Sequence, residues 1–245
     1  MSIPQLIHQV WFQGEAQLPE KYRRYRASWQ RHHPDFQCLL WDAHALREHV
    51  ATHWPQFLPV YDAFPHDVQR MDSARYCLLA TLGGIYADMD IECLRPVDEL
   101  LAGHELILSE TVGYNIAFIA SATGHPLWET VLHHLTHKIY AGLDDVPAFM
   151  RESAAMQIAA VSGPRFFTLC VEESGVLALA ETLACPGDYF EGNGRTENGI
   201  AYGRHDMDLN WMSPSARLLS RLARGFSSIA SGMRFRRKKS KGESF

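Results

Sequence analysis

The chain has 245 residues, of which 47% are hydrophobic and 21% are charged, and its formal net charge is −5 at pH 7. A chain of this size and composition can bury a full hydrophobic core, which excludes a scaffold that depends on disulfide bonds. The five cysteines are scattered, odd in number and without paired metal-ligand spacing, so we expect reduced thiols, as in a cytosol. We find no run of about eighteen apolar residues, and the first predicted strand begins almost at Met1, so we expect neither a signal peptide nor a membrane anchor.

Runs of residues typical of strands alternate along the chain with helical stretches. We expect strands over residues 6–12, 37–41, 85–91, 105–108 and 116–119. We expect helices over residues 19–31, 67–82, 126–140 and 164–173. This alternation predicts an α/β sheet with helices on both faces, whose ligands bind beyond the carboxyl ends of the strands.

The first predicted strand carries two residues that invite a functional interpretation. Trp11 ends this strand, where its ring either stacks on a nucleobase or fills the edge of the sheet, and both readings stay open. His8 lies within the same mainly apolar strand, and we interpret it as structural.

The segment 70–90 reads as a helix, a Gly-Gly stop and a strand with two carboxylates. Apolar residues recur at helical spacing up to Leu82, and Gly83-Gly84 can end a helix without a Cβ penalty. Apolar and polar residues then alternate, so an extended strand projects Asp88 and Asp90 from one face. Two such carboxylates repel each other unless a cation lies between them, and hard oxygen ligands suit Mn²⁺ or Mg²⁺.

An Asp-x-Asp triplet by itself is weak evidence, because about one is expected by chance in a chain of this length. This chain has a second triplet, Asp206-Met207-Asp208, and only the preceding helix and Gly-Gly stop favour the first. Within that helix Asp72 and Arg75 are three residues apart and share a face, which is also the pattern of a surface ion pair.

The pattern Arg-x-Asp-x-x-Arg-x-x-x-Leu-x-x-x-Gly-Gly-x-Tyr-x-Asp-x-Asp, from Arg70 to Asp90, resembles the signature of family 32 glycosyltransferases. That family contains yeast-type initiating mannosyltransferases and bacterial capsule and lipopolysaccharide sugar transferases, and the glucosylating domains of large clostridial toxins carry a similar block. Shorter matches follow in the family's order, at residues 3–11, 33–42, 115–126, 162–164 and 205–211. The resemblance covers roughly residues 3 to 212.

The resemblance implies a glycosyltransferase A fold, in which a Rossmann-like mixed sheet is flanked by helices. It implies a retaining transfer of a hexose from a UDP- or GDP-linked sugar to a glycan or lipid-linked acceptor in surface polysaccharide synthesis. No carboxylate in the sequence is an obvious nucleophile, so we expect a front-face displacement. The chain has no Gly-x-Gly-x-x-Gly, so a metal has to hold the diphosphate that a glycine loop holds elsewhere.

The same resemblance implies roles for individual residues. Asp90 is the firmer metal ligand, and Asp88 bridges the ribose, the metal or the sugar. Asp72 and Arg75 contact the donor sugar and its phosphate. The other candidates for contacts with the donor are Trp11, Tyr86, Asn115 and Trp211. For Asn115, at a strand edge, a role in turn geometry is an equal alternative.

The segment 202–211 is the second candidate part of the site. A neutral imidazole is a competent Mn²⁺ ligand, so a closing loop could bring His205 to the ion while Trp211 meets the leaving group. Asn210 stands where Ser is common in the family, and Asp206 and Asp208 compete with His205 for the ligand position. The alternative is an acidic surface loop that binds no metal.

Residues 213–245 differ from the rest of the chain, and we expect a catalytic domain over 1–212 followed by this basic tail. The tail has nine Lys and Arg and one Glu, with an apolar stripe opposite the arginines of its first half. This pattern favours an amphipathic helix on an anionic membrane over a nucleic-acid contact or a disordered tail. The eukaryotic Golgi members of the family are membrane-anchored, whereas we expect no anchor in this chain. We therefore expect a bacterial cytoplasmic protein, peripheral on the inner face of the membrane, with no nucleic-acid partner.

Two alternatives from other classes remain. The Asp-x-Asp strand superficially resembles that of haloacid dehalogenase-type phosphatases, in which Asp88 would be a phosphorylated nucleophile. About eighty residues precede the motif here, whereas those enzymes carry it near the start of their domain. The other alternative is a non-catalytic membrane-binding protein with a transferase-like fold.

Overall fold

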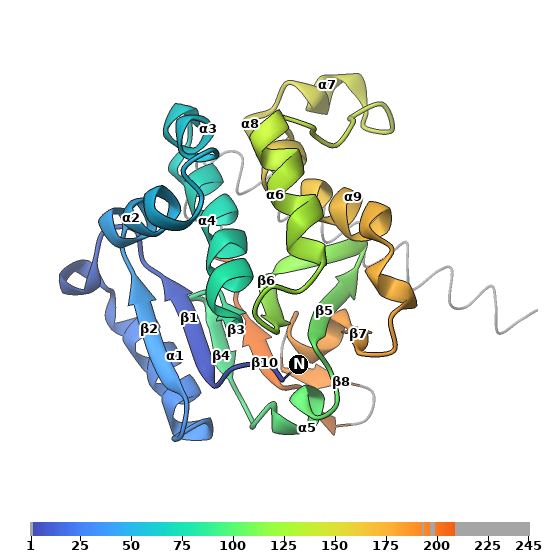
Figure 1. Ribbon diagram of the computed structural model, residues 1–245. Coiled ribbons are helices and arrows are strands. Elements are labelled where there is room, and N and C mark those ends of the chain that lie inside the picture. The colour runs from blue at the N-terminus through green and yellow to red at the C-terminus, as the bar shows by residue number, and fades with distance from the viewer. Residues whose placement is uncertain (1, 193, 197–198, 209–245) are drawn as a thin grey trace, which may run out of the picture. The chain divides into compact units, whose positions relative to one another are not determined.

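The computed structural model describes residues 2–192, 194–196 and 199–208 (Figure 1). Its compact unit, Met1–Met207, is built on a six-stranded sheet with the strand order β2-β1-β3-β6-β5-β7. These strands are β1 (Leu6–Val10), β2 (Gln37–Trp41), β3 (Gly84–Ala87), β5 (Leu106–Thr111), β6 (Gly113–Ser121) and β7 (Thr182–Pro186). All of them run in one direction except β6, which is antiparallel to both of its neighbours. The carboxyl ends of the five parallel strands therefore meet at one edge of the sheet.

Helices cover both faces of this sheet, as the sequence predicts (Figure 1). They are α1 (Glu20–His32), α2 (Ala43–His53), α3 (Leu58–Ala63), α4 (Asp67–Leu82), α5 (Asp98–Leu101), α6 (Leu127–His137), α7 (Ala148–Arg151), α8 (Ala154–Val161) and α9 (Pro164–Ser174). One core packs α2, α4, α6 and α9 on one face, and a second core packs Trp29 of α1 on the other. Alternation along β3 sends Ile85 and Ala87 into the second core and Tyr86 into the first.

The Gly-Gly pair at the junction of α4 and β3 is required by close packing as well as by backbone shape. Gly83 has φ +66° and Gly84 has φ +94°, a region that L side chains rarely adopt. A Cβ on Gly83 would lie 2.7 Å from the backbone nitrogen of Thr123, and one on Gly84 would lie 2.7 Å from the carbonyl oxygen of Leu6. The helix stop predicted at this pair is confirmed.

The strand predicted over residues 85–91 is wrong beyond Ala87. The chain leaves β3 at Asp88, makes a turn in which the Ile91 N–H donates to the Asp88 carbonyl at 3.1 Å, and then enters β4 (Ile91–Cys93). The side chain of Met89 is buried in a small cluster with Leu18 and Tyr22. A continuous strand and this turn give the same alternation of apolar and polar residues in the sequence. The turn also buries Met89 and leaves Asp88 and Asp90, on either side of it, to contact other residues.

The turn gives β4 a partner from the far end of the described chain. β4 pairs antiparallel with β10 (Gly203–His205), with His205 opposite Ile91. A second small sheet joins β8 (Arg195–Thr196) to β9 (Gly199–Ile200). The β4–β10 ladder brings the second segment singled out in the sequence to the acidic turn.

Within the described ranges, one stretch has the length and apolar composition of a membrane-spanning helix, Ala154–Ser174, although the sequence showed no apolar run of that length. It consists of α8 and α9, which meet at Ser162-Gly163. Phe166 and Phe167 of α9 are fully buried against the central sheet. We assign the stretch to the core, because buried core helices can have the same length and apolar composition as a membrane-spanning helix.

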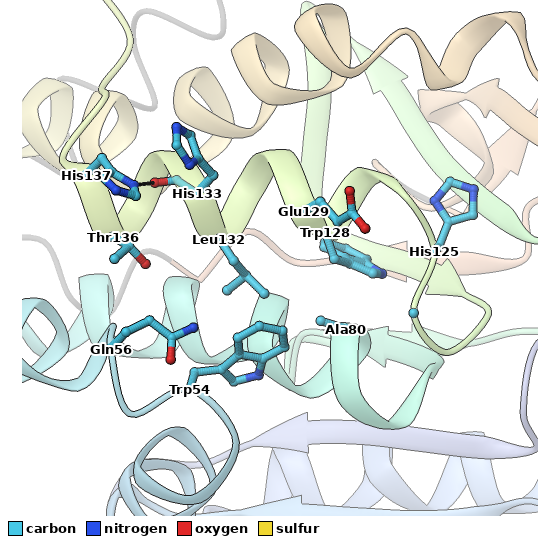
Figure 2. Close-up of a pocket in the computed structure, with 11 residues that line it drawn as sticks. Trp54, Gln56, Ala80, His125, Trp128, Glu129, Leu132, His133, Thr136 and His137 are labelled. Carbon is cyan, nitrogen blue, oxygen red and sulfur yellow. Dashed lines mark hydrogen bonds between the residues drawn. The ribbon is translucent and has the colours of Figure 1, made fainter.

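A cavity of about 410 Å³ lies between α4, α6 and the segment after α2 (Figure 2). Its lining combines apolar and polar side chains, among them Trp54, Trp128, Leu132, Gln56, Glu129 and His133. None of the acids singled out in the sequence contributes to it. The predicted division of the chain at residue 212 stays a prediction, and the basic tail lies outside the described residues.

Candidate active site

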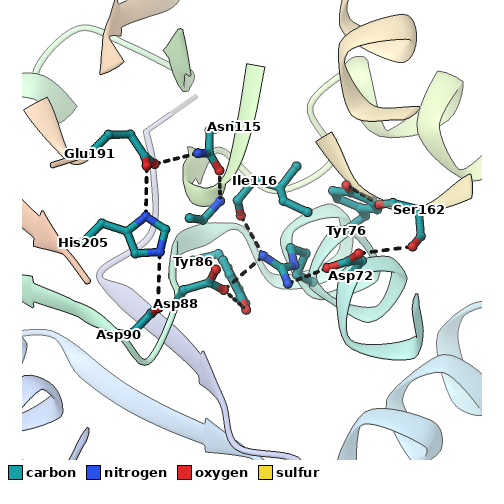
Figure 3. A network of polar contacts seen from close by, with 12 residues as sticks. Asp72, Tyr76, Tyr86, Asp88, Asp90, Asn115, Ile116, Ser162, Glu191 and His205 are labelled. Carbon is teal, nitrogen blue, oxygen red and sulfur yellow. Dashed lines mark hydrogen bonds and ion pairs between the residues drawn. The ribbon is translucent and has the colours of Figure 1, made fainter. Parts of the chain in front are cut away.

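Asp88, Asp90 and His205 come together at the carboxyl end of β3 (Figure 3). The Asp88 backbone N–H donates to the Ala117 carbonyl at 2.8 Å, which ties the start of the turn to β6. The β4–β10 register then puts His205 beside Asp90, with 3.2 Å between His205 Nε2 and Asp90 Oδ1. One possible ligand atom from each of the three residues lies within 4.8 Å of the other two.

This donor set suits a divalent cation. Two carboxylates supply hard oxygen ligands for Mg²⁺ or Mn²⁺, and the imidazole is a ligand that Mn²⁺ accepts. The side chains of Asp88, Asp90 and His205 are 29%, 15% and 10% exposed, so an ion can reach the set from solvent. The structure thus brings together the three residues that the sequence proposed as metal ligands.

Asp88 is also held from the side of α4. Its Oδ1 accepts a hydrogen bond from Tyr86 Oη at 2.8 Å and one from Arg75 Nη1 at 3.1 Å. Burial raises the pKa of Asp88, the Arg75 charge opposes that shift, and Asp90 adds to it. A cation beside Asp90 would relieve the remaining repulsion between the two carboxylates.

Arg75 links the acidic turn to the core. Its guanidinium lies 4.4 Å from the centre of the Tyr86 ring and donates to the Ile116 carbonyl and to Asp72 Oδ1, both at 2.8 Å. Asp72 Oδ2 accepts from Ser162 Oγ at 3.1 Å. Burial raises the pKa of Asp72 to about 7 against the opposing charge of Arg75.

Asp72 and Arg75 are 4% and 5% exposed, so both side chains point into the protein. The sequence left open a surface ion pair for these two residues, and burial excludes it. In this structure their contacts position Asp88. Their predicted contacts with the donor sugar and its phosphate, and that of Tyr86 with the donor, stay predictions.

The second nitrogen of His205 contacts a residue that the sequence did not single out, Glu191, at 3.0 Å between Nδ1 and Oε2. Asn115 Nδ2 donates to the other oxygen of Glu191 at 2.7 Å. Burial lowers the pKa of His205, but the paired carboxylates of Asp90 and Glu191 outweigh it and raise that pKa to about 10. Glu191 belongs to no motif, and its loop lies 14 residues before His205, so no sequence signal identifies it.

Asp206, the first acid of the second triplet, faces α1 instead of the metal set. Its carboxylate lies 2.7 Å from Lys21 Nζ and accepts from Tyr25 Oη at 2.7 Å. Its backbone N–H donates to the Asp90 carbonyl at 3.0 Å, which holds β10 against the turn. The Asp206 side chain therefore faces α1 and does not compete with His205 for the ligand position.

Of the two tryptophans that the sequence proposed for donor contacts, Trp11 is among the described residues and Trp211 is not. Trp11 directly follows β1, and its ring centre lies 5.1 Å from that of Tyr22. Its indole N–H is buried and has no hydrogen-bond partner among the described residues. Its stacking on a base stays a prediction, and Trp211 and Asn210 lie outside the described residues.

Residues 19–107 match the family model described as glycosyltransferase sugar-binding region containing a DXD motif. The chain is 34% identical over 140 residues to inositol phosphoceramide mannosyltransferase 1 of Schizosaccharomyces pombe, a match that covers 55% of this chain and 43% of that protein. It is 32% identical over 117 residues to the initiation-specific alpha-1,6-mannosyltransferase of Candida albicans, covering 44% of this chain and 29% of that protein. The chain thus spans less than half the length of these curated relatives. The family resemblance inferred from the sequence is confirmed.

The fold is similar to that of the ligand-free glycosyltransferase domain of the YGT toxin, with a TM-score of 0.55 at 9% sequence identity. That match covers 75% of this chain and 80% of the toxin domain. The predicted glycosyltransferase A fold is confirmed. Both curated relatives are fungal, so the expectation of a bacterial source stays a prediction.

Proposed function

We propose that this chain, whose residues 19–107 match the DXD sugar-binding region, is a metal-dependent glycosyltransferase. It moves a hexose from a UDP- or GDP-linked sugar to a glycan or glycolipid acceptor. The observation that carries the proposal is the convergence of Asp88, Asp90 and His205 at the edge where ligands of such sheets bind. These three residues would hold Mn²⁺ or Mg²⁺, which when bound supplies Lewis-acid stabilisation to a departing diphosphate.

The protein's own side chains prepare this site for a charged ligand. Arg75 places its charge between Asp72 and Asp88, so both acids are partly neutralised before any donor binds. Tyr86 and Arg75 fix Asp88 from one side, and the β4–β10 ladder fixes His205 from another. Groups preorganised in this way need little rearrangement when negative charge develops on the leaving group.

We propose that transfer occurs with retention and by front-face displacement. Both oxygens of Asp72 are held within the protein, by Arg75 and Ser162, and Asp88 and Asp90 are assigned to the cation, so we expect no carboxylate nucleophile. The acceptor oxygen then forms its bond to the anomeric carbon on the face from which the diphosphate departs. The hydroxyl proton passes to the leaving phosphate oxygen, and no covalent sugar–enzyme bond forms.

The names of the relatives make mannose the first sugar to test and a glycolipid the first acceptor. A basic tail at residues 213–245 fits a lipid-linked acceptor, because it would hold the domain at an anionic membrane surface. We place this surface at the inner face of the membrane. The phosphatase alternative is not favoured, because residues 19–107 match the glycosyltransferase sugar-binding region that contains a DXD motif.

A thermal-shift screen of the full chain tests the proposal. GDP-mannose and a panel of UDP-sugars are each added with and without Mn²⁺. A ligand at 100 times its Kd stabilises the native state by about 2.7 kcal/mol, which for this size corresponds to roughly 5–10 °C. We expect a nucleotide sugar to give such a shift only when metal is also present. It should vanish in Asp90→Ala and persist in Asp206→Asn, the matched acid that faces α1. The proposal fails if no nucleotide or nucleotide sugar gives a metal-dependent shift.

A further inference from the structure

Glu191 is an acid at the site that neither its sequence context nor the metal set accounts for. Its carboxylate contacts two side chains from different parts of the fold, His205 Nδ1 at 3.0 Å and Asn115 Nδ2 at 2.7 Å (Figure 3). Its side chain is only 10% exposed. A charge buried to this extent needs a specific partner, and both of its oxygens have one.

The backbone that carries Glu191 is firmly anchored. The preceding Phe190 is fully buried and stacks on Phe118 of β6, with 3.5 Å between ring centres. The Glu191 N–H donates to the Gly187 carbonyl at 2.7 Å, and the Tyr202 N–H donates to the Tyr189 carbonyl at 2.9 Å. The carboxylate is thus presented to His205 from a fixed point in the core.

Asn115 completes the support with both ends of its amide. Nδ2 donates to Glu191, and Oδ1 accepts from the Ala117 N–H at 2.8 Å. Both polar groups of the side chain are therefore engaged within the protein. This geometry assigns Asn115 to the support of Glu191. Its contact with the donor, expected from the sequence, stays a prediction.

We propose that Glu191, held by Asn115, is a positioning residue that orients the His205 ring so that Nε2 faces the cation. The inference rests on the proposed function. A histidine that binds a metal through one nitrogen usually donates the other N–H to a carboxylate, which fixes the tautomer and strengthens the ligand. Here Nδ1 is on the Glu191 side and Nε2 is on the side of Asp90.

The test is the binding of Mn²⁺ to the full chain, measured from the EPR signal of the Mn²⁺ that remains free. Pulsed EPR of the bound Mn²⁺ then detects the ¹⁴N coupling of a coordinated imidazole. Glu191→Gln keeps the size of the side chain and removes its charge. We expect its Kd for Mn²⁺ to rise by about 10- to 100-fold and the ¹⁴N coupling to weaken. His205→Ala, which should abolish the coupling, identifies the signal.

Glu92→Gln is the matched control, because it removes the same charge from β4, where Glu92 pairs with Arg204 at 2.7 Å. Its Kd should stay within about two-fold of that of the wild type, since it lies outside the ligand support. Asn115→Ala should shift the Kd in the same direction as Glu191→Gln by a smaller factor, and it replaces that variant if Glu191→Gln does not fold, as judged by circular dichroism.

The outcomes separate this inference from the proposed function. If the wild type binds Mn²⁺, Asp90→Ala does not, and Glu191→Gln keeps the wild-type Kd, only the inference is overturned. A weaker Kd with unchanged ¹⁴N coupling also overturns it, because the loss then does not act through His205. If the wild type binds no Mn²⁺, the inference and the proposed function fall together.

Discussion

At the scale of single residues, the contacts around two identical Asp-Met-Asp triplets give them different roles. Asp88 and Asp90 lie in a turn beside His205, whereas Asp206 is held by Lys21 and Tyr25 of α1. The helix and Gly-Gly pair before the first triplet indicated the difference in advance. The contacts of Asp206 could not be foreseen, because they join it to Tyr25 and Lys21, which lie 181 and 185 positions earlier.

His8 shows a structural role that the sequence suggested and that can be tested by pH. It is fully buried, contacts the Gly83 carbonyl through Nε2 at 2.9 Å and accepts from the Trp41 indole N–H at Nδ1. These contacts hold the neutral ring, and burial lowers its pKa to about 4.

We expect His8 to make stability fall as pH decreases from about 6.5 to 4. In this window His8 is protonated in the unfolded chain but not in the folded chain, so the free energy of unfolding rises with pH. The change levels off below about pH 4. The full effect is about 3 kcal/mol. Urea unfolding of wild type and His8→Gln at several pH values measures it, since other buried histidines contribute equally to both. Equal pH dependence in the two proteins would contradict the account.

At the scale of elements, the strongest local signals gave accurate boundaries. The helix predicted over residues 67–82 is α4 and the strand predicted over 37–41 is β2, with the same limits. The break at Asp88 was not predictable from periodicity, because β4 is defined by pairing with β10, far along the chain. The predictions also missed α2, α8 and β7, the last of which forms a sheet edge beside β5.

At the Gly-Gly junction the backbone approaches neighbouring segments too closely to admit a Cβ. We expect Gly83→Ala to lower the free energy of unfolding by about 2–4 kcal/mol, from left-handed strain and the clash with Thr123 together. Gly103→Ala is the control, since Gly103 also has positive φ, +80°, but a Cβ added there would meet no atom within 4 Å. Its loss should be about 1–2 kcal/mol, strain alone. Equal losses in urea unfolding would show that close packing at the junction does not matter.

At the scale of the whole molecule, the candidate site is assembled from segments scattered over the described chain. Arg75 comes from α4, Asn115 from β6, Glu191 from the loop after β7 and His205 from β10. The sequence identified the members that lie in motifs. It could not identify Glu191, because its role exists only once the sheet and the β4–β10 ladder have formed.

The charge asymmetry of the chain leads to a prediction on membrane binding. Replacing the six basic residues between 234 and 241 by Gln should abolish salt-sensitive binding to vesicles containing phosphatidylserine, because each Lys or Arg near such a surface contributes about 1 kcal/mol. Co-sedimentation of the full chain measures it, and vesicles of neutral lipid are the control. Unchanged binding of the variant would contradict the proposal that the basic tail binds an anionic membrane.

Turnover of nucleotide sugars is the most direct test of the central claim, that Asp88, Asp90 and His205 form a metal site for sugar transfer. We expect slow hydrolysis of GDP-mannose or a UDP-sugar by the full chain with Mn²⁺ or Mg²⁺, lost on chelation and reduced by at least about 100-fold in Asp90→Ala, since the metal would stabilise the charge of the leaving diphosphate. Equal turnover in Asp90→Ala, or release of phosphate from phosphomonoesters in place of nucleotide-sugar cleavage, would contradict it.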